Sequence, residues 1–307
     1  MRALVTGSGG FVGRHLVAHL RAAGDEVHDL DCERAEGAAR VDITEPDAVT
    51  GRLDEVAPDV VYHLAGWSDV GGSWQAPLEA FRANAEGTLN VLQAAAAAGV
   101  GRTIVVSSAD VYGAVPDERL PVTEDHPLRP ASPYAASKVA ADFLGLQAFL
   151  GRGLDVVRVR AFNHIGPGQT DRFVVAAIAS RIARNERDGG DEIAVGNLAA
   201  RRDFTDVRDV VRAYRLLATD AVAGEVYNVC SGRDVAVSAL ADLLIAKAVH
   251  PMQLVIDPGR HRPVDVPVVR GDAGRLAAAT GWAPAIPLEA TLVDVLADWR
   301  ARVAGDA

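Results

Sequence analysis

The first thirteen residues constrain the fold more than any other segment of this 307-residue chain. A short apolar strand over Arg2–Val5 leads into glycines at positions 7, 10 and 13, and a helical pattern over 11–23 follows. Gly7 permits a tight turn, Gly10 lets the backbone approach a phosphate group, and Gly13 lets the helix pack closely on a sheet. Because this glycine spacing follows a strand and opens a helix, it predicts a dinucleotide site at the helix N-terminus.

Strand-length apolar segments alternate with longer helical patterns through the first half of the chain. We predict strands at 26–30, 60–63, 103–107 and 155–160, and helices at 46–56, 77–98 and 133–150. This alternation is typical of parallel β-α-β units. It therefore predicts the α/β class, with a Rossmann-like doubly wound parallel sheet.

After Arg160 the rhythm changes, because glycine and proline interrupt the chain more often. We predict helices at about 172–184, 207–218, 238–249 and 288–303, with short strands near Ile193, Val226 and Leu254. The expected division is an NAD(P)-binding Rossmann domain, residues 1–165, and a smaller C-terminal α/β lobe that binds substrate, residues 166–307. Segments between 192 and 230, including a strand near Tyr227, are expected to cross back to the main sheet.

The composition excludes several classes of partner. A net charge of −10 argues against nucleic acid and anionic membranes. The longest apolar stretches, 94–98 and 173–179, are shorter than the roughly 20 residues that span a bilayer. Cys32 and Cys230 are too few for a disulfide framework, and the histidines show no HxxxH spacing in a helix beside a carboxylate. We therefore expect a cytoplasmic protein without a metal and without a secretory signal.

The end of the second predicted strand bears on the choice of coenzyme. Asp31 lies 18 residues after Gly13, where a carboxylate can accept hydrogen bonds from an adenosine ribose and repel a 2′-phosphate. This position favours NAD(H), whereas Arg34 nearby keeps NADP(H) possible. Asp42 and Ile43 follow a third short strand, where an acid and an apolar residue can flank an adenine.

A tyrosine and a lysine share one face of the helix that Ser132 caps. Tyr134 and Lys138 are four residues apart, so their side chains are neighbours. A lysine ammonium is expected to lower the pKa of a nearby phenol, which is otherwise near 10. The pair can then exchange a proton with an alcohol or ketone while a nicotinamide exchanges hydride. Ser108, at the carboxyl end of an upstream strand, can hydrogen-bond the same oxygen.

These motifs resemble the extended short-chain dehydrogenase/reductase family, or NAD-dependent epimerase/dehydratase family, which acts mainly on nucleotide-activated sugars. The matching segments are Thr6–Gly13, His63–Gly66, Asn84 ahead of Gly87-Thr88, Ser108, and Tyr134 with Lys138. The resemblance implies that Ser108, Tyr134 and Lys138 form a catalytic triad. The coenzyme contacts that we expect are Gly7, Gly10, Phe11, Val12, Gly13, Asp31, Asp42, Ile43, Leu64, Ala65, Gly66, Asn84, Ser107, Tyr134 and Lys138.

The resemblance continues into the second half, where Arg160–Gly168 matches the RxFNxxGPG segment of the family. It implies that Asn163 contacts the sugar-nucleotide phosphates and that Asn197 lies near the nucleobase. Arg202 and Arg262 match two diphosphate-binding arginines, and a guanidinium suits this task because it binds phosphate oxygens bidentately. The substrate contacts that we expect are Ser68, Val70, Ser73, Asn163, Val174, Asn197, Arg202 and Arg262.

The residues after Ser108 bear on the reaction. Many hexose 4,6-dehydratases of this family carry two consecutive acids there, but this chain has Ala109 and then Asp110. The pattern argues against the two-acid dehydratases and leaves Asp110 as a candidate catalytic carboxylate. The segments 163–169, 195–198, 202–214 and 227–232 are similar to those of GDP-4-keto-6-deoxy-D-mannose reductases, which make GDP-D-rhamnose. The similarity implies reduction of a C4 ketone on a nucleotide-diphosphate sugar, with Tyr134 as the general acid.

Three other functions remain open at this point. An NDP-hexose 4-epimerase like UDP-glucose 4-epimerase uses the same triad, and a GDP-mannose or NDP-hexose 4,6-dehydratase with one carboxylate is also compatible. A non-catalytic nucleotide-binding regulator is disfavoured because all three triad residues are present. Members of the family often dimerise through the helices that correspond here to 77–98 and 132–150, so we expect a homodimer.

Overall fold

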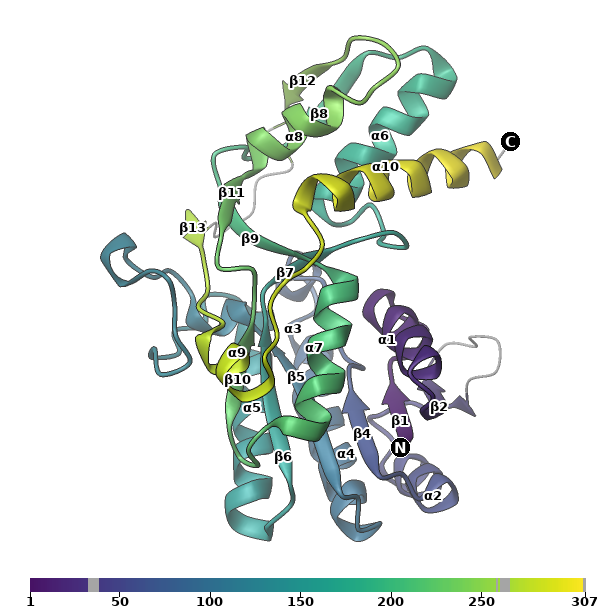
Figure 1. Ribbon diagram of the computed structural model, residues 1–307, viewed down its shortest axis with the longest axis vertical. Coiled ribbons are helices and arrows are strands. Elements are labelled where there is room, and N and C mark those ends of the chain that lie inside the picture. The colour runs from purple at the N-terminus through teal and green to yellow at the C-terminus, as the bar shows by residue number, and fades with distance from the viewer. Residues whose placement is uncertain (33–38, 258, 260–265, 306–307) are drawn as a thin grey trace.

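The computed structural model describes residues 1–32, 39–257, 259 and 266–305. In these residues a seven-stranded sheet, parallel throughout, has the order β10-β6-β5-β4-β1-β2-β3 (Figure 1). Its strands are β1 (Arg2–Thr6), β2 (Glu26–Asp31), β3 (Ala39–Arg40), β4 (Val60–His63), β5 (Arg102–Ser108), β6 (Val156–Ala161) and β10 (Val226–Val229). The strand that contains Tyr227 is thus at one edge of the main sheet. The order reverses at β1, as expected for a doubly wound sheet.

Helices cover both faces of this sheet (Figure 1). One face carries α1 (Phe11–Ala22), α7 (Val207–Asp220) and α9 (Gly274–Thr280). The other carries α2 (Pro46–Val56), α4 (Gly87–Ala97) and α5 (Pro133–Arg152). Parallel strands need crossover connections, usually helices, which explains the alternation of strand and helix patterns in the sequence. Because such crossovers are right-handed, the reversal of strand order at β1 places helices on both faces.

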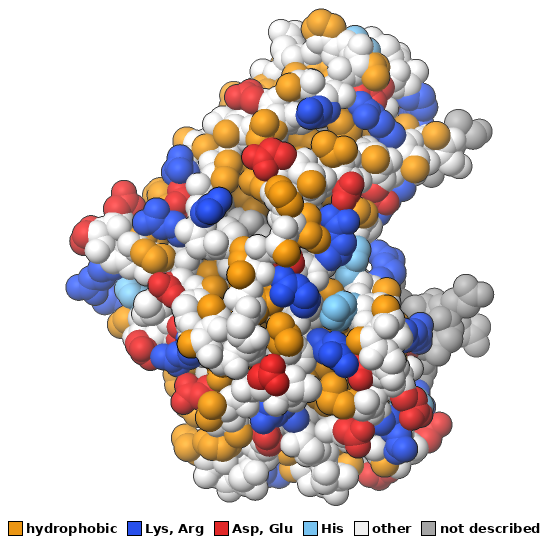
Figure 2. Space-filling model, viewed as in Figure 1, with side chains coloured by type: hydrophobic (Ala, Val, Ile, Leu, Met, Phe, Trp, Pro, Cys, Tyr) orange, Lys and Arg blue, Asp and Glu red, His pale blue; other side chains and the backbone are white. Residues whose placement is uncertain are grey.

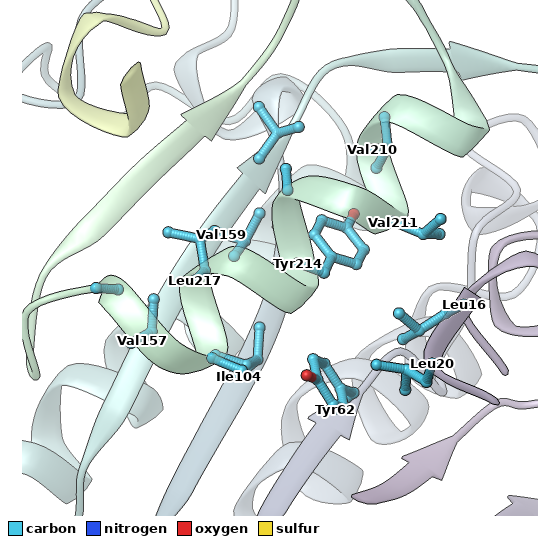
Figure 3. Close-up of a cluster of buried hydrophobic side chains, with 14 of the residues drawn as sticks. Leu16, Leu20, Tyr62, Ile104, Val157, Val159, Val210, Val211, Tyr214 and Leu217 are labelled. Carbon is cyan, nitrogen blue, oxygen red and sulfur yellow. The ribbon is translucent and has the colours of Figure 1, made fainter. Parts of the chain in front are cut away.

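The core consists of two apolar layers, one on each side of the sheet. Ala3 and Val5 of β1 belong to the layer under α1 and α7, whereas Leu4 belongs to the layer under α2 and α4. Successive strand residues point to opposite faces, so a strand buried on both faces is continuously apolar. Figure 3 shows the first layer, in which Tyr62 and Ile104 of the sheet lie between α1 and α7.

A second lobe stands above the carboxyl edge of the sheet (Figure 1). Its helices α6 (Val174–Asp188), α8 (Val237–Ile245) and α10 (Leu288–Gly305) pack on one another around their own apolar cluster. Strands β8 (Glu192–Val195) and β12 (Gln253–Ile256) pair beside them. A small sheet connects the lobes and consists of β7 (Asn163–Ile165), β9 (Arg201–Asp206), β11 (Asp234–Ala236) and β13 (Val268–Val269).

The structure differs from the sequence-based elements in two respects. The helix expected over 77–98 is divided into α3 (Pro77–Phe81), a π-helical turn η2 (Arg82–Glu86) and α4. The π turn carries the buried Asn84, which hydrogen-bonds across to α5. The strands β7, β9, β11 and β13 and the helix α9 were not expected, because each is short and depends on partners remote in sequence.

Within residues 192–230, α7 and β10 lie on the main sheet, whereas β8 and β9 belong to the smaller sheets. None of the described helices has the length and apolar character needed to cross a membrane.

Candidate active site

A cavity of about 1040 Å³ lies at the carboxyl edge of the main sheet, below the second lobe. The glycine turn after β1 and the ends of β2, β4, β5 and β6 form its floor and walls, and residues of β9 and β13 contribute from the second lobe. Ligands of open α/β sheets bind outside the carboxyl ends of the strands, next to the reversal of strand order. The position and size of the cavity therefore fit a large two-part ligand.

The glycine turn is packed too closely for side chains. Gly7 has a φ of 71°, and a Cβ there would lie 2.8 Å from the Ala65 nitrogen. A Cβ on Gly13 would collide with the Gly7 carbonyl oxygen and lie 2.8 Å from the Ser8 backbone. Gly10 begins α1 without a side-chain cap, and the first turn of this described helix contains no acid. The helix N-terminus therefore offers backbone N–H groups and a positive dipole end to a phosphate, which fits a dinucleotide.

Phe11 and Val12 also line the cavity, and Phe11 connects the glycine turn to the second half of the chain. Its ring stacks on His164 with centroids 6.1 Å apart and 14° between the planes. The loop after β7 is tied to α1, since Arg14 donates to the Gly168 carbonyl and His15 bonds to that of Pro167 at 2.7 Å. Figure 2 shows basic and histidine side chains along the hollow between α1 and α10. The glycine turn and the β7 loop are therefore one connected part of the cavity wall.

The predicted adenosine end is assembled from the ends of β2 and β3. Asp31 is nearly buried, and its Oδ2 accepts a hydrogen bond from the Gly9 N–H at 2.8 Å. Asp42 and Ile43 line the same region of the cavity, and Asp42 Oδ1 accepts from the Thr44 N–H at 2.9 Å. Arg34, which kept NADP(H) possible, lies outside the described residues.

The structure brings the three candidate catalytic residues to one wall of the cavity. Tyr134 and Lys138 lie on α5, whose first turn is capped by the Ser132 hydroxyl, as the sequence predicts. Lys138 Nζ donates to the Val106 carbonyl at 3.1 Å, so the lysine is held against the end of β5. Ser108 ends that strand, and its Oγ accepts from the Asp110 N–H at 3.2 Å.

The pKa of Tyr134 differs from the sequence-based expectation. Burial raises the pKa of this phenol well above its usual range, and the Asp110 carboxylate raises it further, while a hydrogen bond with Ser108 acts in the opposite direction. Burial also lowers the pKa of Lys138 to about 8. The expected lowering of the tyrosine pKa by Lys138 is therefore not found, and desolvation sets the direction of the shift instead. Tyr134 is consequently in the protonated, proton-donating form at neutral pH.

Asn84 was expected to contact the coenzyme and Ser73 the substrate, but both instead hydrogen-bond to the helix α5. Asn84 Oδ1 accepts from the Trp67 N–H at 2.9 Å, and its Nδ2 donates to Ser137 Oγ at 2.8 Å. Ser73 Oγ accepts from the Tyr134 N–H at 3.1 Å. Among the described residues neither is part of the cavity wall. Both connect the loop after β4 to the segment that holds the tyrosine and the lysine.

The remaining coenzyme candidates Leu64, Ala65, Gly66 and Ser107 line the cavity. So do four expected substrate contacts, Ser68, Val70, Asn163 and Arg202.

Two further expected substrate residues are not brought there. Val174 and Asn197 are exposed and stand outside the described cavity wall, and Arg262 lies outside the described residues. Both misplaced residues came from the resemblance alone. They lie in the second lobe, where the path of the chain has no local sequence signal.

Sequence reasoning missed several residues of the wall. Trp67 directly follows the His63–Gly66 motif and could have been included on that ground. Phe173 precedes α6, and nothing in its surroundings distinguishes it from other apolar residues. The missed residues with an aromatic ring or a charge include Trp67, Trp74, Glu79, Arg82, His164 and Phe173.

Comparison with known proteins decides the family. A family model described as GDP-mannose 4,6 dehydratase matches residues 4–295. The chain belongs to this family. It is therefore an enzyme of the extended short-chain dehydrogenase/reductase type, and the family resemblance and the Rossmann-like fold class expected from the sequence are confirmed.

Relatives with three activities are similar over nearly the whole chain. A GDP-6-deoxy-D-mannose reductase of Pseudomonas aeruginosa is 42% identical over 98% of both chains. A UDP-glucose 4-epimerase of Mycolicibacterium smegmatis is 33% identical over 94% of this chain and 95% of the relative. A dTDP-glucose 4,6-dehydratase of Actinoplanes is 30% identical over 98% of both.

Solved structures of reductases and epimerases are similar to this chain as well. RMD from Pseudomonas aeruginosa complexed with NADPH superimposes with a TM-score of 0.89 and 40% identity, covering 98% of this chain and 100% of that one. A UDP-glucose 4-epimerase from Thermotoga maritima with UDP-glucose has a TM-score of 0.92 and 27% identity, covering 99% and 100%. The fold is thus shared by reductases and epimerases, so the reaction must be argued from the site.

Proposed function

We propose that this enzyme reduces the C4 ketone of an NDP-4-keto-6-deoxyhexose with NAD(P)H. The preferred substrate is GDP-4-keto-6-deoxy-D-mannose and the product GDP-D-rhamnose. One observation carries the proposal: the triad lies in the cavity of the glycine turn, with Tyr134 kept protonated. The 42% identical reductase supports the choice of substrate.

The chain's own residues account for the proton chemistry. A bound NAD(P)H supplies the hydride. Tyr134 gives its proton to the C4 oxygen as charge develops there, and Ser108 donates a hydrogen bond to the same oxygen. The resulting phenolate is stabilised by the Lys138 ammonium, which has a pKa of about 8, and regains a proton from solvent. Tyr134 and Lys138 are nearly buried, which strengthens each of these interactions.

The glycine turn, Asp31 and Lys138 are the residues that would hold the coenzyme. We propose a preference for NADH, because the Asp31 carboxylate repels a 2′-phosphate. We also propose that NADPH is accepted, since the structurally similar RMD is complexed with it. Fluorescence titration with both reduced coenzymes tests the order of affinities, and tighter binding of NADPH would contradict it.

The site disfavours dehydration. Asp110 lines the cavity next to the small, buried Ala109, so this segment supplies one carboxylate where the two-acid dehydratases have two. Epimerisation remains the second candidate, because the 33% identical epimerase matches nearly the whole chain. An epimerase returns hydride to the same sugar and therefore shows no net use of coenzyme.

A coupled assay separates these reactions. The purified enzyme is offered GDP-, dTDP- and UDP-4-keto-6-deoxyhexoses with NADH or NADPH, and the product is identified by mass spectrometry and NMR. Stoichiometric oxidation of coenzyme with the GDP sugar is the expected result. Interconversion of UDP-sugars without net coenzyme use would instead establish an epimerase and refute the reductase.

Replacing Tyr134 with Phe tests the general acid. We expect kcat to fall by about 10³-fold, because general acid catalysis contributes 10²–10⁴-fold. The affinity for NADH should change less than threefold, since the ring remains in place. A kcat within tenfold of the wild type would show that another group protonates the product.

We also propose that the enzyme is a homodimer. Four large apolar side chains, Leu78, Phe81, Phe143 and Leu150, are each about half exposed or more and lie on α3 and α5, which pack against each other. Grouped exposed apolar side chains mark association surfaces. Light scattering should give twice the chain mass, and a Phe81→Ser/Phe143→Ser variant should be monomeric. Exposed Val222 provides the matched control, Val222→Ser, which should stay dimeric.

We propose a cytoplasmic location as well, since the reaction draws on a reduced nicotinamide pool and the chain has too few cysteines for a disulfide framework. Fractionation of cells that express the tagged chain tests this point.

A further inference from the structure

A buried ionic cluster lies directly behind the catalytic helix. Asp142 follows Lys138 by one helical turn on α5 and is fully buried. Its Oδ2 accepts from Arg160 Nε at 2.8 Å, and its Oδ1 accepts from Arg158 Nη1 at 2.7 Å. Both arginines lie on β6 and are nearly buried. A charge in such a place needs its partner, because an uncompensated buried charge costs several kcal/mol.

The Arg160 guanidinium extends from this aspartate toward the segment after Ser108. Its Nη1 donates to the Tyr112 hydroxyl at 3.1 Å and to the Glu124 carbonyl at 2.9 Å. The guanidinium carbon also lies 5.2 Å from the centre of the Tyr112 ring. The planar fork of arginine allows all these contacts at once, which an ammonium group cannot reproduce.

The Tyr112 hydroxyl both accepts and donates a hydrogen bond. It accepts from Arg160 and donates to Asn228 Oδ1 at 2.7 Å. Burial raises the pKa of this phenol to about 12, so the donated proton is retained at neutral pH. Asn228 is itself buried and anchored to β10. The hydroxyl thus joins two strands of the main sheet, β6 and β10, to the segment that carries it.

That segment is the short 3₁₀ helix η3 (Ala109–Tyr112). It begins at Ser108, whose Oγ caps it, and it carries Asp110 into the cavity. The strand β5 is tied to α5 by the bonds of Val106 and Ser107 with Lys138. The far end of η3 is tied to α5 through Tyr112, Arg160 and Asp142.

We infer that Tyr112 and Arg160 are positioning residues, which hold Ser108 and Asp110 in register with Tyr134 and Lys138. This inference rests on the proposed function, because it assumes turnover by the triad. The halves of the site lie on separate elements, the end of β5 with η3 on one side and α5 on the other. A misplacement of about 1 Å can cost about 10²-fold in rate.

Removing the hydroxyl loosens η3 without touching the coenzyme site. In Tyr112→Phe, Arg160 Nη1 loses an acceptor and Asn228 Oδ1 loses a donor. In Arg160→Lys, the charge opposite Asp142 remains but the fork to Tyr112 and Glu124 is lost. For each variant we expect kcat to fall 10- to 30-fold, with KM and coenzyme affinity within twofold of the wild type.

The chain offers a matched control for each change. Tyr62→Phe removes another buried hydroxyl, one that has no hydrogen-bond partner among the described residues. Arg158→Lys alters the other arginine on Asp142, which donates its second bond to the Gly224 carbonyl and not to η3. Both controls should keep kcat within twofold, even where Arg158→Lys lowers the melting temperature as much as Arg160→Lys does.

The assay is run on the turnover that the wild type shows, either ketone reduction or UDP-sugar interconversion, since both use the triad. A wild-type kcat in Tyr112→Phe would overturn the inference. An equal loss of kcat in Arg158→Lys and Arg160→Lys would overturn it too, because the cluster would then act on stability alone. An inactive wild type in both assays would refute the proposed function, and the inference with it.

Discussion

The glycine turn lines the cavity with backbone atoms. On the side of the second lobe, the cavity is instead lined by a segment that buried carboxylates hold in place. Around Gly7 and Gly13, close packing leaves no room for a Cβ, and the neighbouring layers are apolar. The glycine spacing of this turn lies within one β-α unit, while Gly7 also packs against Ala65 after β4. The turn is therefore specified mainly by a local pattern in the sequence.

In β9 and the first turn of α7, three aspartates at intervals of three residues hold the segment in place. Asp203, Asp206 and Asp209 are all nearly buried. Each accepts hydrogen bonds from segments remote in sequence. These segments are 231–232 and 271 for Asp203, Thr291 for Asp206, and 285–286 for Asp209.

The two regions differ in the sequence separation between the residues whose contacts hold them. A glycine is required where a neighbouring turn leaves no room for a Cβ atom. A buried aspartate, in contrast, is stable only when distant loops supply hydrogen-bond donors to its carboxylate. Substitutions on the glycine side should therefore affect coenzyme binding, and those on the aspartate side should affect stability and substrate binding.

The largest effect is expected from Gly13→Ala. Its methyl group would press on the Ser8 backbone 2.8 Å away and collide with the Gly7 carbonyl oxygen. The NADH dissociation constant should rise at least 100-fold, and the free energy of unfolding should fall by about 3 kcal/mol. Gly51→Ala in α2 meets no atom within 4 Å, so this control should bind NADH normally and be slightly more stable. Normal NADH binding by Gly13→Ala would remove the contrast between the regions.

Asp203→Asn should lower the free energy of unfolding by about 2–3 kcal/mol. The carboxylate accepts from the N–H groups of Ser231, Gly232 and Gly271, and an amide presents one nitrogen that cannot accept. NADH affinity should stay within twofold. Urea denaturation measures the loss, and exposed Asp188→Asn is the control, with a change below about 0.5 kcal/mol. A loss of coenzyme affinity equal to that of Gly13→Ala would contradict the separation.

Arg202→Ala should raise the KM for the nucleotide sugar about 20-fold, because a charged hydrogen bond to phosphate is lost. Arg202 lines the cavity from β9. The preceding Arg201 pairs with Asp234 instead and is not part of the described cavity wall, so Arg201→Ala should leave KM unchanged. Equal effects of the two substitutions would indicate a general loss of positive charge.

The smallest effect concerns His63, which shares a buried network on the coenzyme side. Thr88 Oγ1 donates to the Asn84 carbonyl, so it accepts from His63 Nε2–H, and His63 Nδ1 accepts from Thr6 Oγ1. Burial lowers the pKa of this imidazole to about 3 from its usual 6.5.

The unfolded chain therefore binds more protons than the native protein between these two values, and stability falls as the pH drops below 6.5. His63 should contribute at most about 1.4 kcal/mol per pH unit to that fall. The stability advantage of wild type over His63→Asn should shrink between pH 6.5 and 4.5 in urea denaturation. A constant difference would show that His63 is charged or exposed in the native state.

Much of the site follows from local patterns. The glycine spacing, the acid after β2 and the tyrosine–lysine pair are each contained in a few consecutive residues or one helix face. The parallel sheet brings strand ends to one edge, so Ser108 and Asp31 had to lie near the glycine turn. The π turn at Asn84 and the support from Ser73 could not be predicted, because they depend on hydrogen bonds to another element.

The sequence by itself determined the doubly wound sheet and the glycine turn, since these depend on periodicity and on contacts short in sequence, while the family resemblance supplied the candidate triad. Only the tertiary structure decided which residues of the second lobe reach the cavity, leaving Val174 and Asn197 outside it. It also decided the protonation of Tyr134, because burial and the nearby Asp110 raise its pKa. Desolvation is a property of the whole packed molecule, and no short segment encodes it.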